Sequence, residues 1–364
     1  MKVLWSRGHD DINFDQASIW YCLGIRGAAK STFLEHLGMN YLEHGSVIFD
    51  LFGSKDGEGL AWLRSPYAKD KKILLVKGEN VDVQCSFEVK PAEMLTLNDL
   101  ESYDIIISAN PLYLNFDQEF SCAAKIMDLM YKRFTYKRLL FVLCREAANL
   151  YYSRLKISND QTLAKAQTIY LLRESLHMGL SLALDSVKFT AVDSDIRGLT
   201  DYLILKSQGL FGLPVDLKWL YSVYNPFVLR NMPRKFFGIV CKTGALGLGE
   251  FPPHEWHKER RENIIEAVGL KIERGEPIEE GKDKGTFQTV GDKEHIEIIR
   301  LTIEDDLGMG PIAEKLHRST ATIERHINFH NGEIGRISFC SRCSRARGTY
   351  RDTRAERKLI REYT

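Results

Sequence analysis

A glycine-rich turn near the N-terminus, from Leu23 to Thr32, constrains the fold of this chain more than any other stretch. It reads Leu-Gly-Ile-Arg-Gly-Ala-Ala-Lys-Ser-Thr, in which Gly24, Lys30 and Ser31 have the spacing of the phosphate-binding motif G-x-x-x-x-G-K-[ST]. A short apolar run precedes the turn and a helical pattern follows it. Small residues let backbone N–H groups close on phosphate oxygens, and a helix N-terminus adds its positive dipole end. The motif therefore predicts a nucleotide site between a buried strand and a helix.

The polar groups of this motif have expected partners on the nucleotide. Lys30 would contact the β- and γ-phosphates, and the Ser31 hydroxyl would bind Mg²⁺. Ala29 stands where the motif has its second glycine, and a positive φ there would strain an alanine by about 1 kcal/mol or more. Gly27, two residues earlier, is placed to take over some of the turn. A chance strand–turn–helix is the alternative. The residues expected to contact ATP in the loop are Gly24, Gly27, Ala28, Ala29, Lys30, Ser31 and Thr32.

The composition is that of an ordinary globular protein. Hydrophobic residues make up 44% of the 364 residues and charged residues 27%, and the net charge of +1 indicates no class of partner. No apolar run approaches the roughly 18 residues of a membrane helix, and residues 1–10 lack the apolar core of a signal peptide. The seven cysteines lie mostly singly in apolar runs, which favours a reducing compartment. We therefore expect a cytoplasmic protein without a membrane segment.

Strand-like apolar runs alternate with helical patterns through the first two thirds of the chain, which is typical of a parallel α/β sheet. These patterns place an α/β domain over residues 1–242. Glycine, proline and charge dominate residues 243–292, which we interpret as a connector with one charged helix near 255–273. Residues 293–364 form a small, mainly helical domain. The expected strands lie at residues 19–23, 46–50, 72–76, 104–108, 138–143, 180–184 and 202–206.

A P-loop ATPase needs an acidic residue at the end of a neighbouring strand, where the carboxylate polarises the attacking water. Glu146 directly follows the apolar run at residues 139–143 and is the candidate for this role. Capping of a helix is the alternative role for Glu146.

The stretch that contains Glu146 also carries a family resemblance. Residues 140–151 read Leu-Phe-Val-Leu-Cys-Arg-Glu-Ala-Ala-Asn-Leu-Tyr. This run is similar to the apolar strand followed by Asp-Glu-Ala-x-Asn-Leu in HerA/FtsK-type DNA-translocating ATPases, which belong to the ASCE class of P-loop NTPases. The likeness continues through residues 178–184 and 196–205 and covers roughly residues 15–240. It implies a RecA-like fold, hydrolysis of ATP with Mg²⁺, double-stranded DNA as a partner and a homo-oligomeric ring.

Two positions depart from the pattern of that family. Arg145 stands where the family has its Walker B aspartate, and Val187 falls near a polar strand-end sensor that is commonly glutamine. Asp50, which is followed by a glycine-containing loop as in the family, is a candidate for a compensating carboxylate. The resemblance also implies an arginine from the neighbouring subunit that neutralises charge on the γ-phosphate. Arg173 and Arg197 are the candidates for it, and a surface salt bridge is the alternative for each.

The C-terminal part resembles the helix–turn–helix of DNA-binding domains. Helical patterns at residues 295–303, 310–316 and 320–327 have helix–turn–helix core spacing, and Ser319 or Thr320 caps the third helix. The second helix of the motif enters the major groove in such domains. A helical hairpin that only packs on the ATPase domain is the alternative.

A candidate zinc site overlaps the end of this module, with the spacing His-x₃-His-x₉-Cys-x₂-Cys. Its ligands would be His326, His330, Cys340 and Cys343. Two histidines one helical turn apart share a face, and two thiolates complete a closed four-ligand site, which would be structural. A chance cysteine pair is the alternative.

A basic tail follows the candidate zinc site and suits contacts to phosphates, although a solvated helix face is the alternative. Its Lys and Arg residues are Arg336, Arg342, Arg345, Arg347, Arg351, Arg354, Arg357, Lys358 and Arg361.

These observations together predict an ATP-dependent motor that moves on or pumps DNA. It would combine an α/β ATPase domain with a zinc-stabilised DNA-binding module. The alternative is a nucleotide-gated DNA-binding regulator with weak or no hydrolysis, which Ala29, Arg145 and Val187 favour. A small-molecule kinase is a further alternative, but the sequence shows no lid with clustered arginines for a second substrate.

Overall fold

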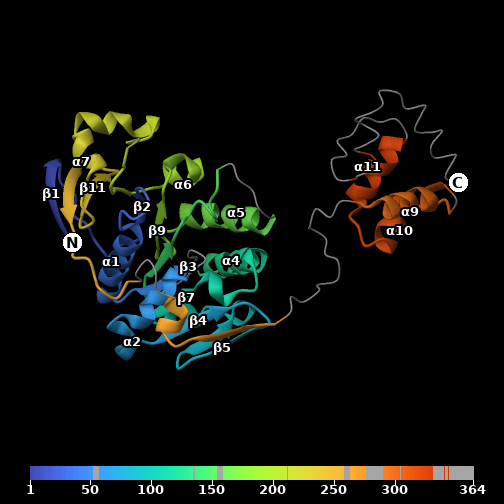
Figure 1. Cartoon of the computed structure of the whole chain (residues 1–364), viewed down its shortest axis with the longest axis horizontal. Coiled ribbons are helices and arrows are strands. Elements are labelled where there is room, and N and C mark those ends of the chain that lie inside the picture. Colours follow the sequence, from blue (N-terminus) through green and yellow to red (C-terminus); the bar gives the residue numbers. More distant parts are fainter. Residues whose placement is uncertain are drawn as a thin grey trace. The chain divides into compact units, whose positions relative to one another are not determined.

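The computed structural model divides the chain into two compact units, Met1–Pro277 and Ile278–Thr364 (Figure 1). Of the side chains at residues 159, 292, 303, 329 and 330 nothing is described, only their backbone. The structure describes residues 1–51, 57–133, 136–153, 159–210, 212–257, 263–275, 290–303, 305–330, 340 and 343.

The first unit is built on a mixed sheet of 11 strands. Neighbouring strands from β10 through to β6 run parallel, whereas β11, β12 and β1 extend one edge in antiparallel fashion. The expected α/β fold with a mostly parallel sheet is confirmed. In order across the sheet the strands are β1 (Lys2–Arg7), β12 (Leu246–Glu250), β11 (Phe236–Cys241), β10 (Tyr202–Leu205), β2 (Ile19–Leu23), β9 (Leu180–Ser186), β8 (Leu140–Cys144), β3 (Val47–Leu51), β7 (Ile105–Ser108), β4 (Ile73–Lys77) and β6 (Glu88–Pro91).

Helices cover both faces of this sheet, which is why every residue of the central strands β2, β9, β8 and β3 is buried. Helix α1 (Lys30–Glu43) follows β2 and packs on β2, β3, β8 and β9. Helices α4 (Phe116–Tyr131) and α5 (Asn159–Arg173) pack against each other. Because parallel crossovers are right-handed, and because α4 and α5 return the chain across the sheet in the direction opposite to α1, they cover the other face (Figure 1).

Shorter elements fill the connections of the first unit. The short α-helices are α2 (Tyr67–Asp70), α3 (Asp99–Ser102), α6 (Ser194–Gly198), α7 (Pro226–Arg230) and α8 (Ile264–Ala267). The 3₁₀ segments are η1 (Glu58–Arg64), η2 (Ala92–Met94), η3 (Asn110–Leu112), η4 (Phe189–Ala191) and η5 (Val215–Ser222). Strands β5 (Val81–Gln84) and β13 (Lys271–Arg274) form a separate antiparallel pair.

The register of the parallel strands brings the ends of β2, β9 and β8 to one edge of the sheet. Leu23, the last residue of β2, pairs with Ser186 at the end of β9. Cys144, the last residue of β8, pairs with Leu184 of β9. The residues that directly follow these strands therefore meet, and they include the glycine-rich turn and Glu146.

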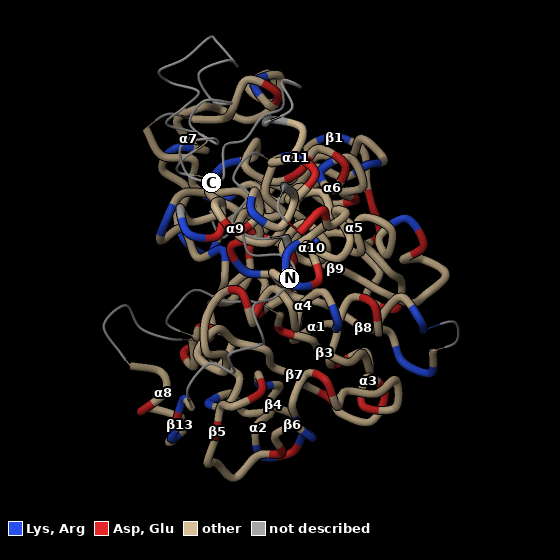
Figure 2. Tube along the Cα trace, turned by 90° about the vertical axis from the view of Figure 1, so that its right-hand side faces the viewer, with Lys and Arg blue, Asp and Glu red and all other residues tan. Residues whose placement is uncertain are grey.

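The expected connector over residues 243–292 is wrong in its first part. Strand β12 lies within that range and pairs with β1 and β11, so the chain is still in the main sheet at Glu250. Within the range 255–273 expected as a charged helix, the described residues form only the short helix α8, and β13 follows it beside β5 (Figure 2). In these strands the backbone N–H and C=O groups form hydrogen bonds with neighbouring strands, whereas in a solvated connector they would bond to water.

The described part of the second unit has helices where the sequence predicts them: α9 (Asp292–Ile303), α10 (Met309–Lys315) and α11 (Thr320–His330). The Ser319 hydroxyl accepts a hydrogen bond from the backbone N–H of Thr322, 3.3 Å away, which is the capping contact expected at the start of α11. The residues of the basic tail lie outside the described part of the chain. The small core consists of Val290, Ile298, Leu301, Ile312, Ala313, Ile323, Cys340 and Cys343.

Lysine and arginine are interspersed with aspartate and glutamate over the described trace (Figure 2). Within the described residues, each helix is too short or too polar to cross a lipid bilayer.

Helix α4 carries a buried carboxylate, Glu119, whose described contacts include a hydrogen bond from an amide and no ion pair. Glu119 is 2% exposed; the Asn110 amide donates to its Oε2 over 2.5 Å, and its Oε1 has no partner among the described residues. Burial raises the pKa of Glu119 to about 7. Between its ordinary pKa and 7 the folded chain therefore holds a proton that the unfolded chain releases, so stability falls as the pH rises through this window.

We predict that Glu119→Gln removes this pH dependence. At pH 8.5 the variant should unfold at a higher temperature than the wild type, by an amount corresponding to about 2–3 kcal/mol, and at pH 5 the two should differ little. Thermal unfolding at both pH values measures the effect, with Asp128→Asn as a control because Asp128 is a half-exposed carboxylate on the same helix. An equal effect of Glu119→Gln at both pH values would contradict the prediction.

Candidate nucleotide site and metal cluster

The glycine-rich turn is held against the ends of two strands. The Gly24 N–H donates to the carbonyl of Ser186 over 3.3 Å, and the Ile25 N–H donates to the carbonyl of Ser207 over 2.9 Å. Gly24 is required by close packing, because a Cβ there would lie 2.7 Å from Cβ of Lys206. The turn is thus fixed between β9 and the end of β10.

Two residues of the turn adopt the left-handed conformation. Gly27 has φ of 76° and Ala29, the N-cap of α1, has φ of 60°. The positive φ considered for Ala29 from the sequence is therefore present, at a cost of about 1–2 kcal/mol for a residue with a Cβ. This conformation turns the chain sharply into α1, whose first N–H groups point out of the helix N-terminus. Such N–H groups and the helix dipole attract phosphate.

The motif lysine lies beside a carboxylate that sequence reasoning did not assign. Lys30 Nζ lies 3.4 Å from the Ile25 carbonyl oxygen and 3.7 Å from Oδ2 of Asp185. Burial raises the pKa of Asp185 to about 6, against the opposing effect of Lys30. The signal in the sequence is an aspartate that ends the apolar run Leu-Ala-Leu-Asp-Ser of β9.

A second unassigned carboxylate contacts the motif serine. The Ser31 hydroxyl donates to Oε2 of Glu58 over 2.9 Å. Glu58 begins η1, directly after Gly57, which has φ of 73°. No motif spacing relates Glu58 to Ser31, because the contact depends on the path of the chain after β3.

Arg145, in the Walker B aspartate position, is completely buried in an ionic network. Its guanidinium contacts Asp50 Oδ2 at 2.6 Å and Glu35 Oε1 at 2.7 Å. The Trp62 indole N–H also donates to Asp50 over 2.8 Å. Asp50, the expected compensating carboxylate, is therefore bound by Arg145 and Trp62, and the carboxylate that contacts Ser31 is Glu58.

The same network reaches a segment after β12. Glu35, on α1 four residues after Ser31, accepts from ring nitrogens of His254 and His257, each at 2.8 Å. Burial alone would raise the pKa of Glu35, but Arg145 and the two histidines hold that pKa well below its usual range. Arg64 fixes the segment by donating to the carbonyl of His257 over 2.9 Å.

Glu146 lies at the same edge of the sheet and is exposed. Its backbone has φ of 47°, and its N–H donates to Oδ1 of Asp185 over 2.5 Å. Residues 145–150 form successive turns, so the helix-capping alternative finds no helix starting at Glu146 within this described stretch. The Glu146 carboxylate is thus accessible to solvent at this edge.

The two candidate trans arginines make contacts within the chain. The Arg173 guanidinium lies 3.8 Å from Asp195, and both side chains are more than half exposed. The Arg197 guanidinium lies 4.6 Å from the ring centre of Phe189 and 3.6 Å from Asp216. Their role in a neighbouring subunit stays a prediction.

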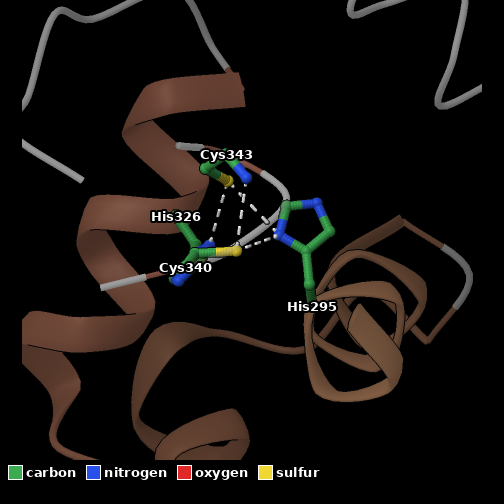
Figure 3. Close-up of side chains that lie close together, drawn as sticks. All are labelled: His295, His326, Cys340 and Cys343. Atoms are coloured by element: carbon green, nitrogen blue, oxygen red, sulfur yellow. Dashed lines mark hydrogen bonds between the residues drawn. The ribbon is translucent and has the colours of Figure 1, made fainter. Parts of the chain in front are cut away.

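The second unit brings four metal-binding side chains together, and Figure 3 shows them facing one another. They are His295, His326, Cys340 and Cys343, all buried, with their donor atoms within 4.8 Å of one another. His295 Nδ1 lies 3.2 Å from the Cys340 sulfur and 3.3 Å from the Cys343 sulfur. Hydrogen bonds from Cys343 and His295 lower the pKa of Cys340 to about 3.

Three of the four predicted zinc ligands belong to this cluster, and His295 of α9 is the fourth member. The side chain of His330, which the sequence predicts as a ligand, lies outside the described residues. Bonds of about 2.3 Å to sulfur and about 2.0–2.1 Å to nitrogen place tetrahedral ligand atoms about 3.5 Å apart. Three of the nitrogen–sulfur separations in the cluster are 3.2, 3.3 and 3.6 Å. The sequence does not indicate His295 as a ligand, because His295 lies 45 residues before Cys340 and on α9, whereas His326 lies on α11.

No protein-family model matches the chain, and no curated protein matches it. Among solved structures, it is similar to the genome packaging NTPase B204 from Sulfolobus turreted icosahedral virus 2 in complex with ATPγS, at 14% identity and a TM-score of 0.38, covering 67% of this chain and 100% of that chain. It is also similar to the pCW3 conjugation coupling protein TcpA with ATPγS, at 14% identity and a TM-score of 0.40, covering 69% and 65%. A third similar structure is EccC from Thermomonospora curvata, at 11% identity and a TM-score of 0.38, covering 67% and 38%.

We predict that Arg145→Gln destabilises the first unit by about 3–5 kcal/mol, because it leaves the carboxylates of Glu35 and Asp50 buried without their cation. Thermal and urea unfolding would measure the loss. Lys235→Gln is the matched control, since Lys235 contacts Glu250 at 2.7 Å in an exposed pair that should contribute less than about 1 kcal/mol. If the two variants lose equal stability, the Arg145 network does not hold this region together.

Proposed function

We propose that this chain is an ATP-hydrolysing motor that acts on double-stranded DNA as a homo-oligomeric ring. The observation that carries the proposal is the phosphate loop between β2 and α1, with Lys30 and Ser31 at the helix start and carboxylates of Asp185, Glu58 and Glu146 around it. The resemblance of residues 15–240 to HerA/FtsK-type DNA-translocating ATPases supports the choice of DNA as partner.

Each residue of the site would have a separate role in ATP hydrolysis. Backbone N–H groups of the loop and the Lys30 ammonium would hold the β- and γ-phosphates and neutralise their charge. Ser31 would hold Mg²⁺, which draws charge from the phosphate oxygens when bound. Glu146 would orient the attacking water and accept its proton, because it is exposed at the strand end next to β9. Arg173 or Arg197 would complete the site of a neighbouring subunit.

A nucleotide-gated DNA-binding regulator is the second candidate function. The observation that favours it is Arg145, because a buried cation replaces the aspartate that usually supports Mg²⁺ in this family. Nucleotide would then set the conformation of the chain, with little turnover.

We expect ATP hydrolysis by the wild type to rise when double-stranded DNA is added. Glu146→Gln should lower kcat by about 100-fold or more and leave nucleotide binding intact, because only the transition state uses the base. Phosphate release and fluorescent-nucleotide binding measure the two quantities. Glu174→Gln serves as the control, since Glu174 is an exposed glutamate in the turn after α5.

The two candidate functions separate in this experiment. DNA-stimulated turnover that depends on Glu146 supports the motor. Tight nucleotide binding without turnover in the wild type supports the regulator and contradicts the motor.

We further propose that the cluster in the second unit binds a structural Zn²⁺ through His295, His326, Cys340 and Cys343. Four protein donors leave no position for water, which fits a structural rather than a catalytic metal. The helix–turn–helix and the basic tail would then contact DNA phosphates from a metal-stabilised base.

The zinc proposal predicts about one zinc ion per chain in the purified protein. His295→Ala and Cys340→Ser should lose the metal, and His330→Ala should keep it if His295 is the fourth ligand. Metal analysis by mass spectrometry, with circular dichroism before and after chelation, measures both metal content and helix loss. Zinc retained in His295→Ala and lost in His330→Ala would assign the fourth ligand to His330 instead.

A further inference from the structure

We propose that Glu58 positions the Mg²⁺ ion of the nucleotide site, in place of the acidic residue that Arg145 has replaced at the end of β8. The inference rests on the proposed function, because it takes the glycine-rich turn to bind a nucleotide with magnesium. Glu58 acts through Ser31, so it is a positioning residue.

The contact between Glu58 and Ser31 has the geometry that this role needs. Ser31 is the motif residue whose hydroxyl oxygen binds the metal, and that hydroxyl donates to Oε2 of Glu58 over 2.9 Å. When a carboxylate accepts a hydrogen bond from a metal-binding hydroxyl group, it orients the lone pairs of the hydroxyl oxygen toward the cation. The same carboxylate adds negative charge beside the metal, which hard cations such as Mg²⁺ prefer.

Glu58 is held in place on both sides. Gly57 before it has a positive φ and packs on Pro111, since a Cβ there would lie 2.8 Å from Pro111 Cγ. Nη1 of Arg145 lies 3.9 Å from Oε2 of Glu58, and this buried nitrogen has no hydrogen-bond partner among the described residues. The Arg145 guanidinium therefore lies beside the Glu58 carboxylate.

The other carboxylates near the loop have different partners. Asp50 and Glu35 are both bound by Arg145, and they are almost completely buried. Asp185 accepts from the Glu146 N–H and lies beside Lys30 rather than Ser31. Glu58, whose side chain is 25% exposed, is the carboxylate that combines contact with Ser31 and access to a ligand.

The negative charge beside the expected metal position therefore comes from a different element in this chain. Where the related ATPases place an aspartate on the strand, this chain has a cation, and the carboxylate comes from η1 instead. Trp62 and Arg64, on the same η1, bind Asp50 and the carbonyl of His257. These contacts anchor η1 and give Glu58 a fixed base.

Magnesium titrations of nucleotide binding test the proposal. Fluorescent ATP binding would be measured in EDTA and then against increasing Mg²⁺ for the wild type, Glu58→Gln, Glu58→Asp and Asp185→Asn. Glu58→Gln should raise the Mg²⁺ concentration at half-saturation by about tenfold or more and leave binding in EDTA unchanged. Glu58→Asp keeps the charge and should lose less. Unfolding temperatures confirm that the variants fold.

The outcomes distinguish this proposal from the proposed function. If the wild type binds no ATP at any Mg²⁺ concentration, both are wrong. If the wild type binds ATP in a Mg²⁺-dependent manner and Glu58→Gln has the same half-saturation, only the role of Glu58 is overturned. A larger rise in Asp185→Asn than in Glu58→Gln also overturns it, because the metal would then be supported from β9.

Discussion

The arrangement of the nucleotide site depends on one buried guanidinium, that of Arg145. Two carboxylates in the interior of an α/β protein would be costly without a cation, and Arg145 contacts both Glu35 and Asp50 within 2.7 Å. These carboxylates come from α1 and β3, whereas Arg145 follows β8. The ion pairs therefore tie α1, the helix that follows the glycine-rich turn, to the ends of two strands.

The parallel direction of the strands determines which residues lie together at that site. Because β2, β8 and β9 run parallel, the residues after each strand lie at one edge. The phosphate loop, Asp185 and Glu146 meet there although they are far apart in the sequence. A hydrogen bond from the Glu146 N–H to Asp185 fixes the turn after β8 relative to the loop. The edge thus gathers the backbone N–H groups of the glycine-rich turn and the side chains of Lys30, Asp185 and Glu146.

The sequence predicted the features that depend on local pattern. The strands expected from uninterrupted apolar runs are present, and the left-handed Ala29 follows from its place in the motif. The sequence predicts a connector where β12 lies, because the Leu-Gly-Leu-Gly pattern of this strand is typical of a loop. Its Gly249 instead allows close packing, since a Cβ there would lie 2.1 Å from the Phe237 ring. The contacts of Glu58 and His295 join distant segments, and no spacing in the sequence encodes them.

The size of the second unit gives a physical reason why the proposed metal at its His–Cys cluster would matter for stability. Its described helices are 12, 7 and 11 residues long, and helices shorter than about 12–15 residues are marginal in water without tertiary packing. Its core is small, and two of its members are the cysteines themselves. His295 lies on α9 and His326 on α11, so a metal bound by both would join the first and last helices and the cysteine pair. Small domains commonly gain from a metal the stability that so few apolar side chains cannot supply.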